Sequence, residues 1–214
     1  MPSLDTLVVF TVAAVVLNLS PGPSNLYVMA RSMSQGPRAG LVAAAGLFTG
    51  ALGHVAAAAF GLSAIVLASA EAFVVLKWVG AAYLVWLGLQ HLVSAGSGLG
   101  RVEQAPAKPM RHIYRESILV ELLNPKTALF FLALLPQFVD PSAGSVAVQS
   151  LILGLIVVVT AIPCDVLVAF SAGVVARKLS ASPWIARWQD RVSGLILIGL
   201  GALVAGGERP EAVR

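Results

Sequence analysis

Charged side chains are scarce in this sequence. Asp, Glu, Lys and Arg make up 11% of its 214 residues, whereas 58% are apolar and the mean hydropathy is +0.88. A soluble domain carries about 25% charged residues, so this composition excludes one and predicts a protein embedded in a lipid bilayer. The net charge of +4 is interpreted as a membrane topology signal, and no nucleic-acid partner is predicted.

Cysteine and histidine are also scarce. The single cysteine, Cys164, excludes an internal disulfide and dithiol chemistry. The three histidines and this cysteine are scattered over the chain without metal-ligand spacing. The sequence therefore predicts no metal site and no cofactor.

Long apolar runs predict an all-α integral membrane protein. A transmembrane helix needs about 20 mainly apolar residues, and isolated charges inside a span are tolerated. Six spans are predicted, although the last is short and its full crossing is left open. They cover residues 6–30, 40–68, 73–95, 115–138, 147–175 and 191–207.

The basic residues predict the orientation of these spans. The loops after the first, third and fifth spans carry Lys and Arg, whereas residues 69–72 and 140–143 on the other side carry none. By the positive-inside rule, both termini are expected outside the cell. The basic residues assigned to the inner loops are Arg31, Arg38, Arg101, Lys108, Arg111, Arg115, Arg177, Lys178, Arg187 and Arg191.

Proline and small polar residues interrupt two of the spans, within the segments Asn18–Asn25 and Leu122–Thr127. Unpaired backbone is tolerated in a bilayer only inside protein or beside an aqueous cavity, so paired breaks indicate a transporter's substrate site. Pro125 lacks an N–H and frees the carbonyl of Glu121 to accept from an ammonium, while a restarted helix suits a carboxylate. The predicted substrate-binding residues are Ser20, Pro21, Gly22, Pro23, Ser24, Asn25, Glu121, Asn124, Pro125 and Lys126.

The two breaks are related by an internal repeat. Sliding the chain on itself by about 104 positions, the distance from Pro21 to Pro125, aligns the halves weakly. Because each half contains three spans, the halves must insert upside down relative to each other, which predicts a 3+3 inverted architecture with broken helices 1 and 4. The single transporter domain then consists of repeat 1 (1–95), a cytoplasmic linker (96–114) and repeat 2 (115–207).

Ionisable residues inside spans are costly and need a reason. Asp165, beside Pro163, is predicted to face the bundle interior and to bind and release a proton during transport. Glu121 fits substrate-amine binding and a partly solvated position at the inner mouth equally well. His54 is a candidate proton relay, but a helix-packing histidine bonded to a backbone carbonyl is somewhat favoured.

Several segments resemble the LysE/RhtB family of amino-acid exporters. They are Leu19-Ser-Pro-Gly-Pro23, Gly80-Ala-Ala-Tyr-Leu-Val-Trp-Leu-Gly88 and Asn124-Pro-Lys-Thr-Ala-Leu-Phe-Phe131, followed by Leu135-Pro-Gln-Phe138. The resemblance implies efflux of amino acids or their derivatives across the bacterial inner membrane, driven by the proton gradient. Ser24 and Glu121 depart from the family pattern, which leaves the specificity open.

Three other classes are weighed against this interpretation. An intramembrane aspartyl protease needs a second aspartate within a span, which is lacking, so an enzyme is not predicted. An exporter of cations or other small metabolites would share the architecture and is the alternative function. A purely structural membrane protein would not require Asp165 and Lys126 at depth. Glycine-rich strips are compatible with a homodimer or with packing inside one chain.

Overall fold

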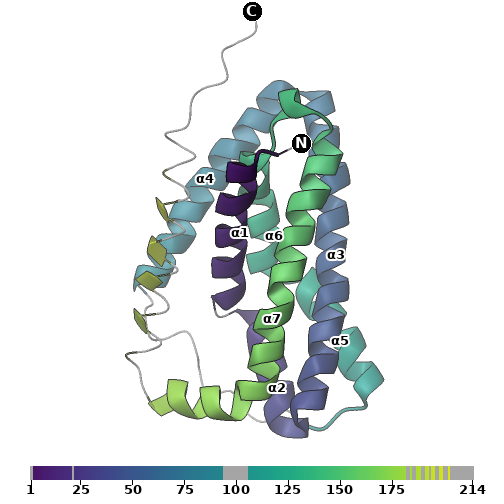
Figure 1. Ribbon diagram of the computed structural model, residues 1–214, viewed down its shortest axis with the longest axis vertical. Coiled ribbons are helices and arrows are strands. Elements are labelled where there is room, and N and C mark those ends of the chain that lie inside the picture. The colour runs from purple at the N-terminus through teal and green to yellow at the C-terminus, as the bar shows by residue number, and fades with distance from the viewer. Residues whose placement is uncertain are drawn as a thin grey trace, which may run out of the picture.

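The computed structural model describes residues 2–20, 22–93 and 106–181, together with scattered residues between 184 and 202. No strand occurs within these ranges, so the all-α prediction is confirmed for them. Figure 1 shows a bundle in which long helices run between two ends, and the end that carries the N-terminus is called the upper end below. The elements are α1 (Leu4–Leu19), α2 (Pro23–Gln35), α3 (Pro37–Ala68), α4 (Ala70–Val93), α5 (Met110–Leu122), α6 (Pro125–Ala133), η1 (Leu135–Phe138), η2 (Pro141–Ala143) and α7 (Val146–Ala181).

The first predicted span is broken into α1 and α2, which meet at 48°. Ser3 caps the start of α1 by accepting from the Thr6 N–H at 3.1 Å. The second helix restarts with Pro23 in its first position, where the missing N–H costs no hydrogen bond. The broken first helix is therefore confirmed, while Pro21 itself lies outside the described residues.

The prediction that Arg31 belongs to a loop is wrong, and other basic residues predicted in loops also lie within helices, namely Arg38, Arg111, Arg115, Arg177 and Lys178. The helix α2 continues to Gln35, and Arg31 lies within it with only 4% of its surface exposed. Its guanidinium is compensated by Glu116, whose carboxylate lies 3.5 Å away. The ion pair with Glu116 on another helix therefore permits Arg31 to be buried, although the positive-inside rule predicts it in a solvent-exposed loop.

The fourth predicted span is broken into α5 and α6, which meet at 42°. Asn124 caps α6, because its Oδ1 accepts from the Lys126 N–H at 3.0 Å, and Pro125 occupies the first helical position. An Asn cap followed by proline is a strong local start signal for a helix. The break predicted here is confirmed. In Figure 1 the chain descends from α1 to α2 and ascends from α5 to α6, so the two broken pairs run in opposite directions.

Within the described residues, α3 and α7 are long and apolar enough to cross a membrane, and four spans result if each bent pair counts as one. Most of the predicted sixth span lies outside the described residues. The six-span count and the inverted repeat therefore stay predictions.

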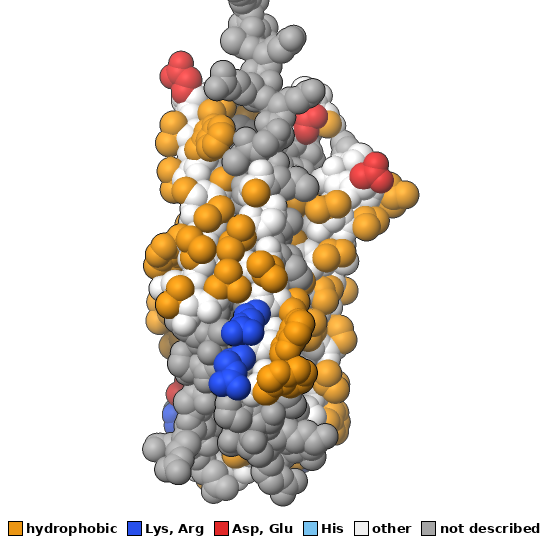
Figure 2. All heavy atoms as spheres, turned by 90° about the vertical axis from the view of Figure 1, so that its left-hand side faces the viewer, with side chains coloured by type: hydrophobic (Ala, Val, Ile, Leu, Met, Phe, Trp, Pro, Cys, Tyr) orange, Lys and Arg blue, Asp and Glu red, His pale blue; other side chains and the backbone are white. Residues whose placement is uncertain are grey.

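The outer surface of the bundle is apolar. Figure 2 shows apolar side chains spread over the face that includes α4, where Val75, Trp78, Val79 and Trp86 are each more than half exposed. Soluble monomers rarely expose so large an apolar surface, whereas lipid tails provide a matching solvent. The surface therefore agrees with a membrane location.

Two buried hydrophobic clusters lie above and below the level of the helix breaks. The upper cluster joins α1, α3, α6, η1 and α7, and the lower cluster joins α2, α3, α5 and α7. The upper cluster includes Phe10, Leu17, Val55, Phe130, Leu134 and Leu153, and the lower cluster consists of Val28, Ala39, Ala43, Leu47, Ile113 and Ala169. The breaks and their polar residues therefore lie between two apolar layers.

Candidate functional site

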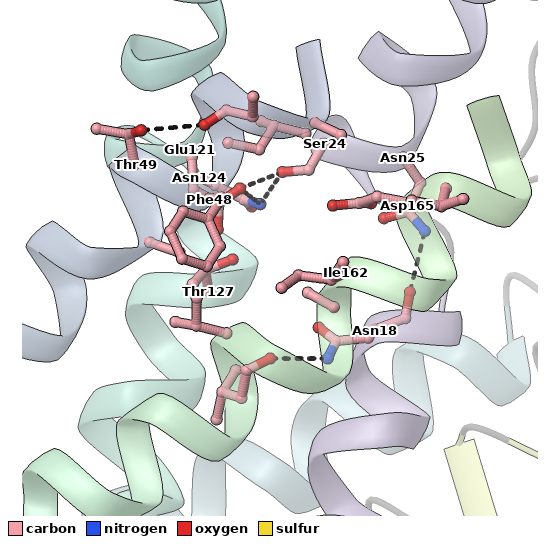
Figure 3. A pocket seen from close by; sticks show the side chains of 18 of the residues that line it. Asn18, Ser24, Asn25, Phe48, Thr49, Glu121, Asn124, Thr127, Ile162 and Asp165 are labelled. Carbon is pink, nitrogen blue, oxygen red and sulfur yellow. Dashed lines mark hydrogen bonds between the residues drawn. The ribbon is translucent and has the colours of Figure 1, made fainter. Parts of the chain in front are cut away.

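A cavity of about 530 Å³ lies at the level of the two helix breaks. Its volume falls within the roughly 300–1,000 Å³ that is typical of small-molecule sites. Figure 3 shows polar side chains entering it from several helices. The polar and charged lining residues are Asn18, Ser24, Asn25, Thr49, Tyr114, Glu121, Asn124, Lys126, Thr127 and Asp165, and the remaining wall is apolar.

One corner of the cavity is a hydrogen-bonded triangle that joins the two breaks. The Ser24 hydroxyl, at the start of α2, donates to the carboxylate of Glu121 at the end of α5. The Asn124 amide donates to the Ser24 hydroxyl at 2.7 Å and to Glu121 Oε2 at 3.4 Å. Glu121 is 5% exposed and lines the cavity, and its role in substrate binding stays a prediction. The triangle holds a carboxylate in the cavity wall with part of its hydrogen-bonding capacity already used.

Lys126 crosses from the second break to the first. Its ammonium donates to the backbone carbonyl of Ser20 at the end of α1. The side chain passes directly over Gly22, where an added Cβ would lie 2.9 Å from Lys126 Cδ and 3.2 Å from Nζ. The backbone of Gly22 is extended at φ −161°, a conformation that any residue can adopt. Glycine is therefore needed here to leave room for the Lys126 side chain, and not for its backbone conformation. The lysine therefore does not snorkel to the surface.

Carbonyls released at the breaks are taken up by side chains. The carbonyl of Asn18 accepts from Asn25 Nδ2 at 3.0 Å. The carbonyl of Glu121, which Pro125 cannot pair, accepts from the Asn124 N–H at 3.0 Å and also lies 2.9 Å from His54 Nε2. Because a carbonyl only accepts, Nε2 carries the hydrogen. The backbone released by proline is thus buried in protein, as the bilayer requires.

His54 lies outside the cavity and contacts the site through the backbone of Glu121. Its ring stacks on Phe131 with 5.9 Å between centroids, and it lines a separate groove of about 220 Å³ between α3 and α6. This geometry matches the helix-packing histidine that the sequence favours. A role of His54 in proton coupling stays a prediction.

Asp165 lines the cavity from α7, two residues after Pro163. Figure 3 shows it across the view from Thr49 and Glu121. The cavity thus brings together two carboxylates and the ammonium of Lys126. Five of the ten predicted substrate-binding residues line the cavity: Ser24, Asn25, Glu121, Asn124 and Lys126. Ser20, Gly22, Pro23 and Pro125 lie at the two breaks beside it, and Pro21 lies outside the described residues.

Sequence reasoning missed Asn18, Thr49 and Tyr114. Asn18 Nδ2 donates to the Val157 carbonyl at 3.1 Å and to Thr160 Oγ1 at 3.0 Å, which ties the end of α1 to α7. A polar side chain at the beginning of the break motif is a signal that could have found it. The hydroxyls of Thr49 and Tyr114 are 2.9 Å apart, and no local pattern announces this pair, because it depends on which helices are neighbours.

Glycines on α3 bring α5 close enough to place Glu121. An added Cβ at Gly46 would lie 2.3 Å from the Tyr114 carbonyl, and one at Gly50 would lie 2.8 Å from Glu121 Cβ. Small residues permit this close approach of helix backbones in membranes. Gly46 and Gly50 therefore serve packing within the chain, and a homodimer stays a prediction.

No group of three His, Cys, Asp or Glu side chains within the described ranges could hold a metal ion. The lining of the cavity instead offers amide, hydroxyl, carboxylate and ammonium groups to a polar small molecule.

Residues 15–207 match the family described as LysE type translocator. The chain belongs to this family. The resemblance seen in the break motifs is thereby confirmed over most of the sequence.

Relatives of the LysE type support a role in membrane transport. The chain is 34% identical over 199 residues to a homoserine/homoserine lactone efflux protein of Salmonella typhimurium, covering 92% of this chain and 94% of the relative. It is 29% identical over 196 residues to a leucine efflux protein of Enterobacter sp. (strain 638), covering 92% and 93%.

A further relative is an uncharacterized membrane protein of Vibrio cholerae, 34% identical over 204 residues and covering 92% of this chain and 94% of the relative. No solved structure matches the chain. These names describe efflux and membrane proteins rather than enzymes, so this LysE translocator is a multi-pass membrane protein.

Proposed function

We propose that this protein exports amino acids or amino-acid derivatives from the bacterial cytoplasm in exchange for protons. The observation that carries the proposal is the cavity at the two helix breaks, which two carboxylates and one ammonium line together. Membership of the LysE family and the efflux relatives support the transport class. Among the described residues no three His, Cys, Asp or Glu side chains are grouped so as to hold a metal ion, so the alternative of a cation exporter gains no support from such a cluster.

The zwitterionic part of an amino acid fits the charges of the site. Its ammonium pairs with the carboxylate of Glu121, which Ser24 and Asn124 already hold in place. Its carboxylate pairs with Lys126 and with the N-terminal end of α2, which has no side-chain cap and where the helix dipole favours an anion. Charge-assisted hydrogen bonds of this kind are the strong ones in proteins.

Asp165 supplies proton coupling in this proposal. Protonation on the outer side and release on the inner side changes the charge of the cavity by one unit. The substrate ammonium is favoured when Asp165 is ionised and disfavoured when it is protonated.

The proposed cycle is alternating access around a fixed site. The positive-inside expectation places the lower end, with Arg31, Lys108 and Arg111, at the cytoplasm and both termini outside. Substrate then enters from the lower end and leaves past the upper cluster. The breaks between α1 and α2 and between α5 and α6 are the natural pivots.

Uptake into everted inner-membrane vesicles tests this function. A panel of labelled amino acids, including neutral, basic and esterified ones, is offered with and without an imposed proton gradient. Gradient-dependent accumulation is expected in the wild type and is expected to be lost in Asp165→Asn. Asp5→Asn, the same chemical change at an exposed residue of α1 outside the cavity, is the matched control. Accumulation that does not depend on the proton gradient would rule out proton antiport. Failure to accumulate any amino acid would rule out amino acids as the substrate class.

A further inference from the structure

A cluster of polar side chains lies at the lower end, outside the substrate cavity. We call it the lower-end clamp. It connects α2, α5 and the segment that leads into α5. Its members are Tyr27, Arg31, Gln35, Lys108 and Glu116.

The carboxylate of Glu116 is the centre of the clamp. Both of its oxygens accept from Lys108 Nζ, at 2.8 and 2.9 Å. Oε2 also accepts from the Tyr27 hydroxyl at 3.0 Å and lies 3.5 Å from Arg31 Nη2. One side chain of α5 therefore holds two residues of α2 and one of the preceding segment.

Arg31 and Gln35 fasten that segment to α2. Arg31 Nη1 donates to the Pro106 carbonyl at 2.9 Å, and its guanidinium lies 5.1 Å from the centre of the Tyr27 ring. Gln35 pairs with both backbone groups of Lys108, each at 2.9 Å. Arg31 Nε is buried without a hydrogen-bond partner in the described part of the chain, so the burial of this cation is incompletely compensated.

The two ends of the bundle are closed by different physical means. In the upper cluster, the Phe10 ring packs against Phe130 at 6.0 Å and against Phe138 at 5.1 Å between centroids. The lower cluster has no aromatic residue among its buried members, and the partly buried Tyr27 of the clamp packs against it. The lower end is therefore held largely by the polar contacts of the clamp, in which Arg31 is buried and Glu116 and Lys108 are partly exposed. Aromatic packing is lost outright when helices separate, whereas water can replace the hydrogen bonds of the partly exposed Glu116 and Lys108.

We propose that the lower-end clamp is the gate between the substrate cavity and the lower side of the membrane. In each transport cycle the Glu116 contacts break, and α2 and α5 separate by bending at the two helix breaks. The helices α2 and α5 are the lower halves of the two broken pairs, so each has a pivot at the level of the cavity. Glu116 and Arg31 thus serve transport without touching the substrate. The inference rests on the proposed function only in requiring that a solute passes through the cavity.

Reversible cross-linking distinguishes a gate that opens during transport from a contact that only stabilises the fold. Cys164 is the only cysteine, so Cys164→Ala gives a cysteine-free background. Tyr27→Cys and Glu116→Cys are combined in it and joined by a reversible bifunctional thiosulfonate. Uptake into vesicles is expected to fall about tenfold or more on cross-linking and to recover on reduction. Each single cysteine variant receives the same reagent as the control. Undiminished uptake by a demonstrably cross-linked protein would overturn the gate.

A second readout does not depend on transport. Ala161, in the cavity wall, is replaced by cysteine in the same background, and its labelling by a membrane-impermeant maleimide is timed. Glu116→Gln, which removes the charge and keeps the shape, is expected to speed labelling about tenfold from one side only, because charge-assisted bonds close the gate. Glu71→Gln, at the exposed start of α4, is the matched control.

Everted and right-side-out vesicles are compared, so the result is independent of the orientation of the chain. Labelling that is unchanged by Glu116→Gln from both sides would overturn the gate. If Glu116→Gln speeds labelling but the protein accumulates no amino acid, the gate is supported and the proposed function is ruled out.

Discussion

The ammonium of Lys126 donates to the backbone carbonyl of Ser20, so the second helix break is tied to the first across 106 positions of the sequence. The contact runs from the side chain of one break to the main chain of the other. It requires Gly22, because the lysine lies where a Cβ would stand. The substrate cavity is therefore built on a contact between the two breaks.

Gly22→Ala is expected to reduce transport without unfolding the protein. The added methyl group would lie 2.9 Å from Lys126 Cδ, so the flexible lysine must leave the Ser20 carbonyl. Losing a hydrogen bond of a charged donor costs about 1.5–3 kcal/mol, and uptake is expected to fall about tenfold or more. Gly61→Ala is the control, since an added Cβ there meets nothing within 4 Å. Wild-type uptake in Gly22→Ala would show that the position of Lys126 does not matter.

Gly50→Ala is expected to destabilise the bundle rather than act on transport alone. Its Cβ would lie 2.8 Å from both the Ile118 carbonyl and Glu121 Cβ, and a backbone atom cannot rotate away. Overpacking of this kind costs about 1–3 kcal/mol. Thermal unfolding in detergent should show a lower Tm than for the wild type, whereas Gly61→Ala should leave Tm unchanged or raise it. An unchanged Tm in Gly50→Ala would mean that α5 is free to shift away from α3.

The helix breaks could be predicted because their cause is local. Proline has no N–H, and Asn124 followed by Pro125 carries its own start signal for a helix. Asp165 could be placed in the interior because a charge in a span needs a protein environment. These inferences need only residues within one or two turns of each other.

The remaining contacts could not be predicted, because they depend on which helices are neighbours. Tyr27 and Glu116 are 89 positions apart, and Thr49 and Tyr114 are 65 apart. The sequence places Arg31 in a loop because the first predicted span ends at residue 30. The sequence near Arg31 contains no sign of its compensating partner on α5.

Asn18 is expected to couple energetically to Thr160. Its amide donates to the Val157 carbonyl and to the Thr160 hydroxyl, which fixes the lower end of α1 against α7. Asn18→Ala, Thr160→Val and the double variant form a thermodynamic cycle, and a coupling energy of about 0.5–3 kcal/mol is expected from unfolding in detergent. Thr11→Val serves as control, since its hydroxyl bonds only within α1, to the Leu7 carbonyl. Strict additivity of Asn18→Ala and Thr160→Val would contradict the coupling.

Glu121→Gln is expected to separate substrate binding from proton coupling. The amide keeps the shape of the carboxylate and can still accept from Ser24, but it cannot form an ion pair with a substrate ammonium. The loss of about 1.5–3 kcal/mol in a charge-assisted bond predicts a rise of KM by about tenfold or more, while the response to a proton gradient is retained. Asp165→Asn should show the opposite pattern, with the gradient response lost. Transport rates are measured in vesicles over a range of substrate concentrations at fixed gradients, with Glu71→Gln at the exposed start of α4 as control. If Glu121→Gln instead removed the gradient response and left KM unchanged, the roles assigned to the two carboxylates would have to be exchanged.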